Sequence, residues 1–228
     1  MKYLFVFILI AFGSASSSAQ KFSTSIDAQL ALPQGDYKDV NADAGYGLRA
    51  NILYKPSYTA PVKLGLELGI LEKARASQYF SGYVSGYYDD FKVSATSNIF
   101  SLMFLVRFQS SQPHKLKPFI DVTGGWNVFF STVSVEDLSY YNSGYDPSYS
   151  NSSKARWALS YGGAGGIDIS LNRRDDIGLE LKVAYIIGSY ANYLTDPYID
   201  SNGNVSFQNN NSRTDMLIPQ AGVRITIH

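Results

Sequence analysis

Few residues in this sequence could carry out acid–base, nucleophilic or metal chemistry. The chain of 228 residues has two histidines, His114 and His228, and no cysteine. The absence of cysteine excludes disulfides and thiolate metal sites. An enzyme that uses only carboxylates or tyrosines stays open, but no motif favours one. We therefore predict a protein that is not an enzyme, with no catalytic residue, no metal site and no cofactor.

Two short stretches have oxygen ligands at the alternate spacing seen in calcium loops. They are Asp39-x-Asn41-x-Asp43 and Asp200-x-Asn202-Gly203-Asn204. Both lack the rest of such a loop, including the distal glutamate. Turns stabilised by Asp and Asn side chains are the favoured interpretation, and a bound calcium ion is the alternative. The glycine-rich run 162–166 precedes no helix, so we expect strand curvature or close packing there and no phosphate loop.

Charged residues recur on one face of segments that alternate with period two. In Val62–Ile70 (VKLGLELGI) the aliphatic residues share one face, whereas Lys63, Glu67 and two glycines share the other. Across the chain the second faces carry five acids and five bases. Inside a narrow barrel these charges would form a network of ion pairs. The predicted network consists of Asp27, Arg49, Lys63, Glu67, Arg107, Asp121, Asp168, Glu180, Lys182 and Arg224.

Tyrosine is abundant, with 18 residues, and it gathers in two stretches rich in serine and glycine, 79–88 and 140–149. This composition suits adaptable binding surfaces, because tyrosine gives contact area at a small entropic cost. The alternatives are solvated loops and, for 80–91, an extended pair of strands. The candidate binding residues are Tyr79, Tyr83, Tyr87, Tyr88, Tyr140, Tyr141, Tyr145 and Tyr149.

Eight segments show this alternation, and their first faces carry no charge. They are Phe22–Leu32, Tyr46–Lys55, Val62–Ile70, Asn98–Phe108, Pro118–Phe130, Arg156–Leu171, Ile177–Gly188 and Leu217–His228. The fourth segment fits least well, because Ile99, Met103 and Leu105 make its second face mostly apolar. Aromatic residues near the segment ends predict a girdle at each membrane interface. The girdle residues are Tyr46, Tyr54, Phe100, Phe108, Trp126, Phe130 and Trp157.

The connections alternate between short and long. Residues 56–61, 109–117 and 172–176 form short links, and residues 33–45, 74–97, 131–155 and 189–216 form long ones. This regularity predicts an all-β fold, an eight-stranded antiparallel transmembrane up-and-down barrel with long extracellular loops and short periplasmic turns. The alternative is a soluble lipocalin-like barrel with the apolar rows as its core. That fold does not predict long loops all at one end.

The first residues, MKYLFVFILIAF, indicate an exported protein. A basic start, a short apolar run and a small-x-small site before Gln20 predict a secretory signal peptide over residues 1–19. Residues 20–228 then form a single outer-membrane barrel domain. Without Lys2, the 19 basic residues become 18 against 19 acidic ones, so no basic surface for nucleic acid is expected.

The signal sequence, VKLGLELGI, GGAGGIDISL and the closing GVRITIH together resemble the outer-membrane β-barrel domain proteins of the Bacteroidota, of the PorT-like and OmpA/OmpX-like type. The resemblance covers the whole mature chain. It implies the outer membrane of a Gram-negative bacterium, contact with outer-membrane lipid, and insertion by the outer-membrane assembly machinery. Enzymes among such small barrels have a histidine at the extracellular rim, whereas His114 falls in a predicted periplasmic turn and His228 ends the chain.

A structural or surface-interaction role through the tyrosine-rich loops, with a surface protein or glycan as ligand, is therefore the favoured function. A narrow pore is the alternative, although a lumen filled by ion pairs should conduct poorly. Assistance in secretion across the outer membrane follows from family association alone.

Overall fold

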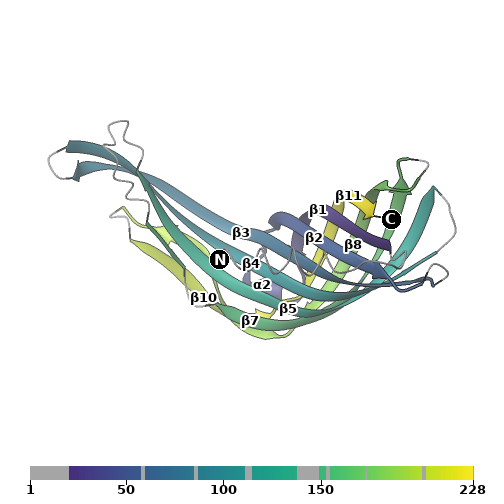
Figure 1. Ribbon diagram of the computed structural model, residues 1–228. Coiled ribbons are helices and arrows are strands. Elements are labelled where there is room, and N and C mark those ends of the chain that lie inside the picture. The colour runs from purple at the N-terminus through teal and green to yellow at the C-terminus, as the bar shows by residue number, and fades with distance from the viewer. Residues whose placement is uncertain are drawn as a thin grey trace.

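The computed structural model describes residues 21–227, apart from 58–59, 85–86, 111–114, 138–148, 153–154, 173 and 202–203. The described residues are almost entirely β-structure, with one short helix (Figure 1). The elements are β1 (Lys21–Pro33), α2 (Asp36–Val40), β2 (Gly45–Lys55), β3 (Val62–Val84), β4 (Tyr87–Gln109), β5 (Leu116–Asp137), β6 (Tyr149–Ser152), β7 (Arg156–Ser170), β8 (Ile177–Gly188), β9 (Tyr190–Ile199), β10 (Val205–Arg213) and β11 (Met216–Ile227).

Eight of these strands form a closed ring. The order around the ring is β1, β2, β3, β4, β5, β7, β8 and β11, and every neighbouring pair is antiparallel. The first and last strands close it, with Phe22 opposite Ile227 and Leu32 opposite Leu217. Closure leaves no unpaired edge along the body of the barrel. The predicted eight-stranded antiparallel barrel is confirmed.

Three neighbouring strands are much longer than the others. β3 and β4 have 23 residues each and β5 has 22, so they extend far beyond the ring (Figure 1). The expected long loop 74–97 is therefore wrong over most of its length, because Ala74 pairs with Ser97 and the ladder continues to Val84 opposite Tyr87. The extended strand pair considered for residues 80–91 is confirmed. The expected loop 131–155 is likewise a strand as far as Asp137.

The other two long connections also contain regular structure. The connection between β1 and β2 contains α2, and the connection between β8 and β11 contains the β9–β10 hairpin. β9 contacts β3, β4, β5 and β7, and α2 contacts β1 and β10. These two connections therefore fold back against the long-loop end of the barrel.

The inside of the barrel has two layers of different chemistry. The half near the short turns holds most of the buried charges, whereas the half near the long loops holds an apolar cluster. This cluster explains the apolar second face of the fourth predicted strand, since Ile99 and Met103 point inward and belong to it. Its members are Ala31, Tyr37, Leu71, Ile99, Met103, Phe129, Ala158, Ala164, Ala184, Ile186, Ala191, Tyr193, Met216 and Ile218.

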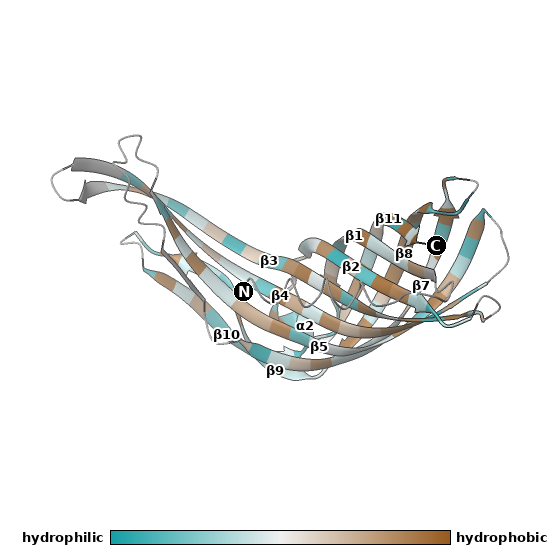
Figure 2. Ribbon diagram, viewed as in Figure 1, coloured by the Kyte–Doolittle hydropathy of each residue, from teal (hydrophilic) through white to brown (hydrophobic). Residues whose placement is uncertain are grey.

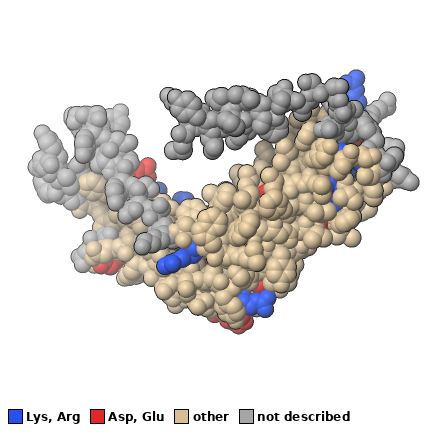
Figure 3. All heavy atoms as spheres, turned by 60° about the horizontal axis from the view of Figure 1, so that its bottom comes forward, with Lys and Arg blue, Asp and Glu red and all other residues tan. Residues whose placement is uncertain are grey.

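The outside of the barrel is apolar, and we call the band of outward-facing apolar side chains on its eight ring strands the apolar belt. Hydropathy alternates along the strands (Figure 2), and the aliphatic residues of the alternation point outward. Leu68 and Ile70 expose 47% and 51% of their surface, whereas Glu67 on the same strand exposes 1%. Few charged residues reach the centre of the face in Figure 3. Buried charges inside and an apolar surface outside are the reverse of a water-soluble barrel, so this surface fits a lipid bilayer.

Among the described residues, no helix is long and apolar enough to span a membrane.

Candidate functional site

Arg107 on β4 occupies the centre of the charged layer. Its guanidinium forms a two-bond pair with Asp121 on β5, with Nε–Oδ1 and Nη2–Oδ2 distances of 2.8 Å. The other side of the group reaches across the lumen to Glu180 on β8, at 2.7 Å to each carboxylate oxygen. Its flat face lies 3.7 Å from the ring centre of Phe119. The planar, five-donor guanidinium suits this arrangement, which a lysine could not reproduce.

Glu67 on β3 is the second centre of the layer. Arg49 on β2 donates to its Oε1, and Lys182 on β8 lies 2.7 Å from its Oε2. The same lysine is 3.7 Å from Asp121, which connects Glu67 to the pairs around Arg107. Arg49 also donates from Nε to Gln29, at 2.8 Å. The lumen is thus bridged from β2 to β8 by charge-assisted bonds, which leaves little room for water or solutes.

A third cluster ties the short-turn end together. Arg224 on β11 pairs with Asp168 on β7 at 2.7 Å and with Asp175 in the β7–β8 turn at 2.8 Å. Asp175 has a positive φ of 62°, and Lys117 and Ser170 also donate to it. Burial tends to raise the pKa of Asp175, but these donors and the charge of Arg224 outweigh it and lower the pKa to about 2. The turn is therefore locked with its carboxylate ionised.

Two members of the predicted network have no oppositely charged partner within ion-pair distance among the described residues. Asp27 on β1 accepts a bond from Ser25 at 2.7 Å, while its other oxygen is buried without a partner. Arg49 lies opposite Asp27 in the strand register but reaches to Glu67 instead. Lys63 donates to Gln109 at 2.7 Å.

Nine of the ten predicted charges are buried inside the barrel. The tenth, Lys63, is half-buried. Sequence reasoning missed several polar partners of these charges. Gln29 and Gln109 share the inward parity of their strands and could have been found by that signal. Asp175 could not, because its role depends on the backbone of a turn.

An aromatic plug, defined as Tyr37, Phe129 and Tyr193, closes the lumen at the long-loop end. Tyr37 comes from α2, Phe129 from β5 and Tyr193 from β9. The ring of Tyr37 packs edge-on against Tyr193 at 5.3 Å and Phe129 at 6.5 Å, and Phe129 and Tyr193 stack at 5.2 Å. Tyr193 shares a hydrogen bond of 2.6 Å with Ser212 on β10. Burial raises the pKa of Tyr37 well above its usual range, so the plug is uncharged.

Lys73 holds the plug to the wall of the barrel. Lys73 exposes only 4% of its surface. This burial is notable for its position, because the neighbouring outward residue, Glu72, already lies beyond the apolar belt. Its ammonium group donates to the backbone carbonyls of Asn41 and Asp43 and lies 4.8 Å from the ring centre of Tyr37. Burial lowers the pKa of Lys73 to about 8, and the charge of Asp43 offsets part of that effect.

The predicted girdle residues point outward. Tyr54 and Phe108 lie near the short-turn end, where Tyr54 packs against Phe22 at 5.3 Å. Tyr46 and Trp157 lie near the other end and expose 60% and 66% of their surface. Trp126 lies within the belt, in edge-on contact with Phe104. Phe100 and Phe130 lie on the same outward faces of β4 and β5.

The tyrosine-rich stretches are described only in part. Tyr79 is exposed on the extended part of β3, and the Nζ of Lys92 lies 5.9 Å from its ring centre. Tyr83, Tyr87 and Tyr88 belong to the β3–β4 pair, and Tyr149 begins β6. Tyr140, Tyr141 and Tyr145 lie outside the described residues, as do both histidines.

The two candidate calcium stretches show turn chemistry. The Asn41 side chain accepts a bond from the backbone of Asp43, and Asp200 accepts bonds from the backbone and amide of Asn204. Within the described part of the chain, no three histidine, aspartate or glutamate side chains group closely enough to hold a metal ion.

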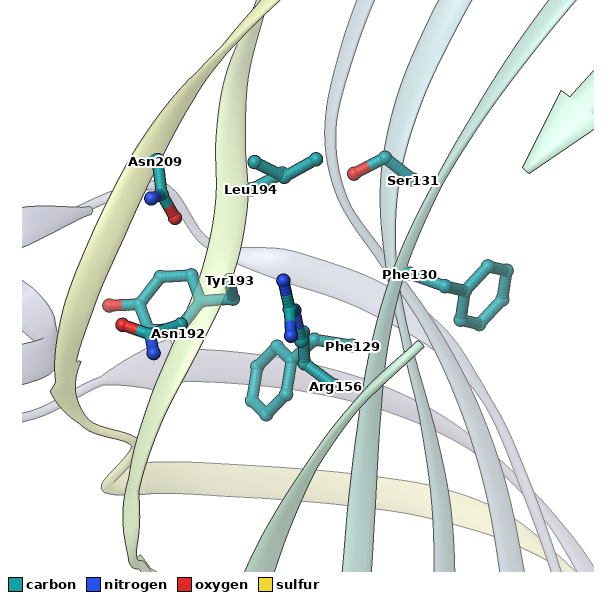
Figure 4. Close-up of a pocket in the computed structure, with 8 residues that line it drawn as sticks. All are labelled: Phe129, Phe130, Ser131, Arg156, Asn192, Tyr193, Leu194 and Asn209. Atoms are coloured by element: carbon teal, nitrogen blue, oxygen red, sulfur yellow. The ribbon is translucent and has the colours of Figure 1, made fainter. Parts of the chain in front are cut away.

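Two adjoining hollows open beside the plug. One, of about 340 Å³, lies between β5, the start of β7 and the β9–β10 hairpin (Figure 4). The other, of about 480 Å³, is lined by the start of β7 and by the same hairpin. Arg156 and Asn192 line both hollows. We call the two together the rim groove.

No protein-family model and no curated protein matches this sequence. Several solved outer-membrane proteins are similar in structure. A major outer membrane protein of Thermus thermophilus is 13% identical, with a TM-score of 0.45 over 92% of this chain and 100% of that one. Neisserial surface protein A is 13% identical, with a TM-score of 0.43 over 91% and 97%. Ail of Yersinia pestis, in complex with the heparin analogue sucrose octasulfate, is 11% identical, with a TM-score of 0.35 over 91% and 97%. TM-scores below 0.5 establish no relationship, so the fold is assigned from the strand pairing of this chain.

Proposed function

We propose that this protein is an integral outer-membrane barrel that acts through its extracellular part, as a surface-interaction protein without a conducting lumen. The observation behind the proposal is the contrast between a filled interior and an extended exterior. Ion pairs bridge the half of the lumen near the short turns (the lower lumen), and the aromatic plug closes the half near the long loops (the upper lumen). Beyond the apolar belt, by contrast, three strands continue as a sheet.

The length of these strands indicates how much structure lies outside the bilayer. A barrel strand needs roughly 9–11 residues to cross a membrane. β3 therefore has roughly 12 residues to spare, or about 40 Å of strand at ~3.3 Å per residue. Ordering so many residues costs conformational entropy that membrane insertion alone does not require. A surface presented to another molecule gives this extension a use.

The outer membrane is the location that this architecture favours. An even number of antiparallel strands, short turns at one end and long connections at the other are typical of outer-membrane barrels of Gram-negative bacteria. The long connections then face outward and the short turns face the periplasm. The predicted signal peptide over residues 1–19 lies outside the described residues and stays a prediction. It is consistent with the same location, and so is the resemblance to Bacteroidota barrels.

Shortening the β3–β4 extension tests the proposed function. Ser77 lies opposite Ser94, so residues 78–93 can be replaced by Asn-Gly, a favoured two-residue hairpin turn. Bacteria that display the full protein should adhere to arrays of immobilised proteins and glycans more than cells without it. The shortened variant should lose at least 90% of this excess adhesion.

The control is the barrel itself, measured by heat-modifiable mobility in detergent gels and by fractionation with the outer membrane. Both properties should be unchanged in the shortened variant, because the ladder of the ring from Glu72 to the short turns is retained. Equal adhesion by the two forms would contradict the surface role of the extension. Fractionation away from the outer membrane would contradict the location.

A further inference from the structure

The rim groove has an arginine that nothing in the described structure neutralises. Arg156, the first residue of β7, is exposed and forms no ion pair with any described carboxylate. In Figure 4 its side chain lies beside Phe129 on β5 and Tyr193 on β9, which line the same hollow, while Phe130 points away. An unpaired guanidinium that lines a hollow favours an anionic ligand, because it can bind a carboxylate or phosphate through two parallel bonds.

Three amide side chains line the same hollows as this arginine. Asn192 lines both hollows, Asn209 lines the inner one and Asn211 the outer one. None of these three amides donates to or accepts from another described residue. Each offers two donors and one acceptor oxygen at the end of a short side chain. Such groups match the hydroxyls of a sugar, which also donate and accept.

Aromatic rings form the sides of the outer hollow. Trp157 and Tyr190 each expose 66% of their surface there. The Tyr190 hydroxyl donates to Asp36 on α2 at 3.4 Å, which limits the positions of that ring. Phe129 and Tyr193, which stack on each other, line the inner hollow. Exposed rings offer flat apolar surfaces to the C–H faces of a sugar, and a volume of several hundred Å³ is the size range of small-molecule sites.

The outer hollow adjoins the membrane-facing belt. Trp157 and Leu159 lie on the same outward face of β7, and Leu159 is 56% exposed within the belt. A saccharide bound beside Trp157 would therefore be level with the headgroups of the outer leaflet, with acyl chains alongside Leu159. This placement favours a lipid-linked saccharide over a free one.

We propose that the rim groove binds the anionic saccharide headgroup of an outer-leaflet glycolipid, with Arg156 on its acidic group and Asn192 on its hydroxyls. The inference rests on the proposed outer-membrane location and names one ligand class for the rim of the barrel. It does not depend on the β3–β4 extension, which is the surface tested above.

The experiment uses the full mature chain in phosphatidylcholine nanodiscs, with retained lipid measured by native mass spectrometry. Four probes are added separately at matched amounts: lipopolysaccharide, its delipidated oligosaccharide, an uncharged galactolipid and phosphatidylglycerol. Arg156→Ala and Asn192→Ala are the test variants. Arg75→Ala is the matched control, because Arg75 is also an exposed arginine beyond the belt, but it lies on β3, away from the groove, and pairs there with Glu72 at 2.7 Å.

Of the four probes, lipopolysaccharide should be retained most strongly by the unchanged protein. Arg156→Ala should weaken its retention at least tenfold, and Asn192→Ala should have an intermediate effect. Retention by Arg75→Ala should stay within twofold of the unchanged protein. Equal retention by Arg156→Ala and Arg75→Ala would overturn the site. Equal retention of phosphatidylglycerol or of the uncharged galactolipid would overturn the anionic saccharide, and equal retention of the free oligosaccharide would overturn the lipid source. A protein that inserts but binds none of the probes contradicts this inference alone, whereas one that fails to insert contradicts the proposed function.

Discussion

At the scale of single residues, the interior depends on cations shared between carboxylates. Arg107 contacts both Asp121 and Glu180, and Lys182 contacts Glu67 and approaches Asp121. Removing one member leaves an uncompensated buried charge, which typically costs about 3–5 kcal/mol. The matched signs in the sequence indicated such pairing. Which cation meets which carboxylate could not be predicted, because the register alone does not decide it: Arg107 pairs with Asp121 directly opposite, whereas Arg49, opposite Asp27, reaches to Glu67 instead.

Lys73 gives a pH dependence whose sign follows from its position. Its pKa falls from 10.5 to about 8 on folding, chiefly because burial removes water from the ammonium group. Between these two pH values the unfolded chain binds a proton that the folded chain has released. The free energy of unfolding should therefore rise with pH across this window, by on the order of 3 kcal/mol in total.

Chemical unfolding of the barrel from lipid vesicles at pH 7, 8, 9 and 10 measures this effect. Lys73→Met, which nearly keeps the length of the side chain, should remove the rise while other titrating groups continue to contribute equally to both proteins. If the unchanged protein and the Lys73→Met variant gave parallel stability curves from pH 7 to 10, Lys73 would not be buried as an ammonium group.

At the scale of elements, the glycine-rich part of β7 alternates between crowded and open positions. A Cβ on Gly162 would clash with the carbonyl oxygen of Tyr185 on β8, whereas a Cβ on Gly165 would meet nothing within 4 Å. Gly162→Ala should therefore destabilise the barrel by about 1–3 kcal/mol, as overpacking does. Gly165→Ala faces outward and should leave stability nearly unchanged.

The midpoint of heat modification on detergent gels distinguishes these two variants, which carry the same substitution three residues apart on one strand. The close packing expected for this run applies to its inward glycines, since Gly165 and Gly163 meet little or no protein. Equal midpoints for both variants would contradict the close approach of β7 and β8 at Gly162.

The sequence predicted the strand boundaries at the short turns far better than the strand boundaries at the long loops. Within the belt, one apolar and one polar face leave a clear period of two. At Glu72 the ladder shifts by one residue, and Lys73 is the extra one. Beyond this bulge, Arg75, Ser77 and Tyr79 alternate with Ala74, Ala76 and Gln78, which are small or polar, so the large aliphatic row that identifies a strand ends although the hydrogen bonding continues.

At the scale of the whole molecule, the closure of the lumen is a tertiary property. Tyr37, Phe129 and Tyr193 are far apart in the sequence, and two of them lie in segments expected to be loops. Nothing local to either segment shows that α2 and β9 meet over the barrel. The burial of nine of the ten predicted charges, by contrast, follows from strand parity alone. The lower closure of the lumen was therefore predictable and the upper closure was not.

Two closures in series make a specific prediction for conductance. The unchanged protein should be silent in planar bilayers. Deleting part of the plug, by replacing residues 190–213 with a short linker, should leave it silent, because the pairs around Arg107 still fill the lumen. Replacing Arg107, Asp121 and Glu180 together by alanine should also leave it silent while the aromatic plug remains. Only the variant that combines both changes should conduct, provided that each variant retains heat-modifiable mobility.

A steady open conductance in the unchanged protein would instead favour the narrow pore. Conductance after either single change would mean that the remaining layer does not close the lumen.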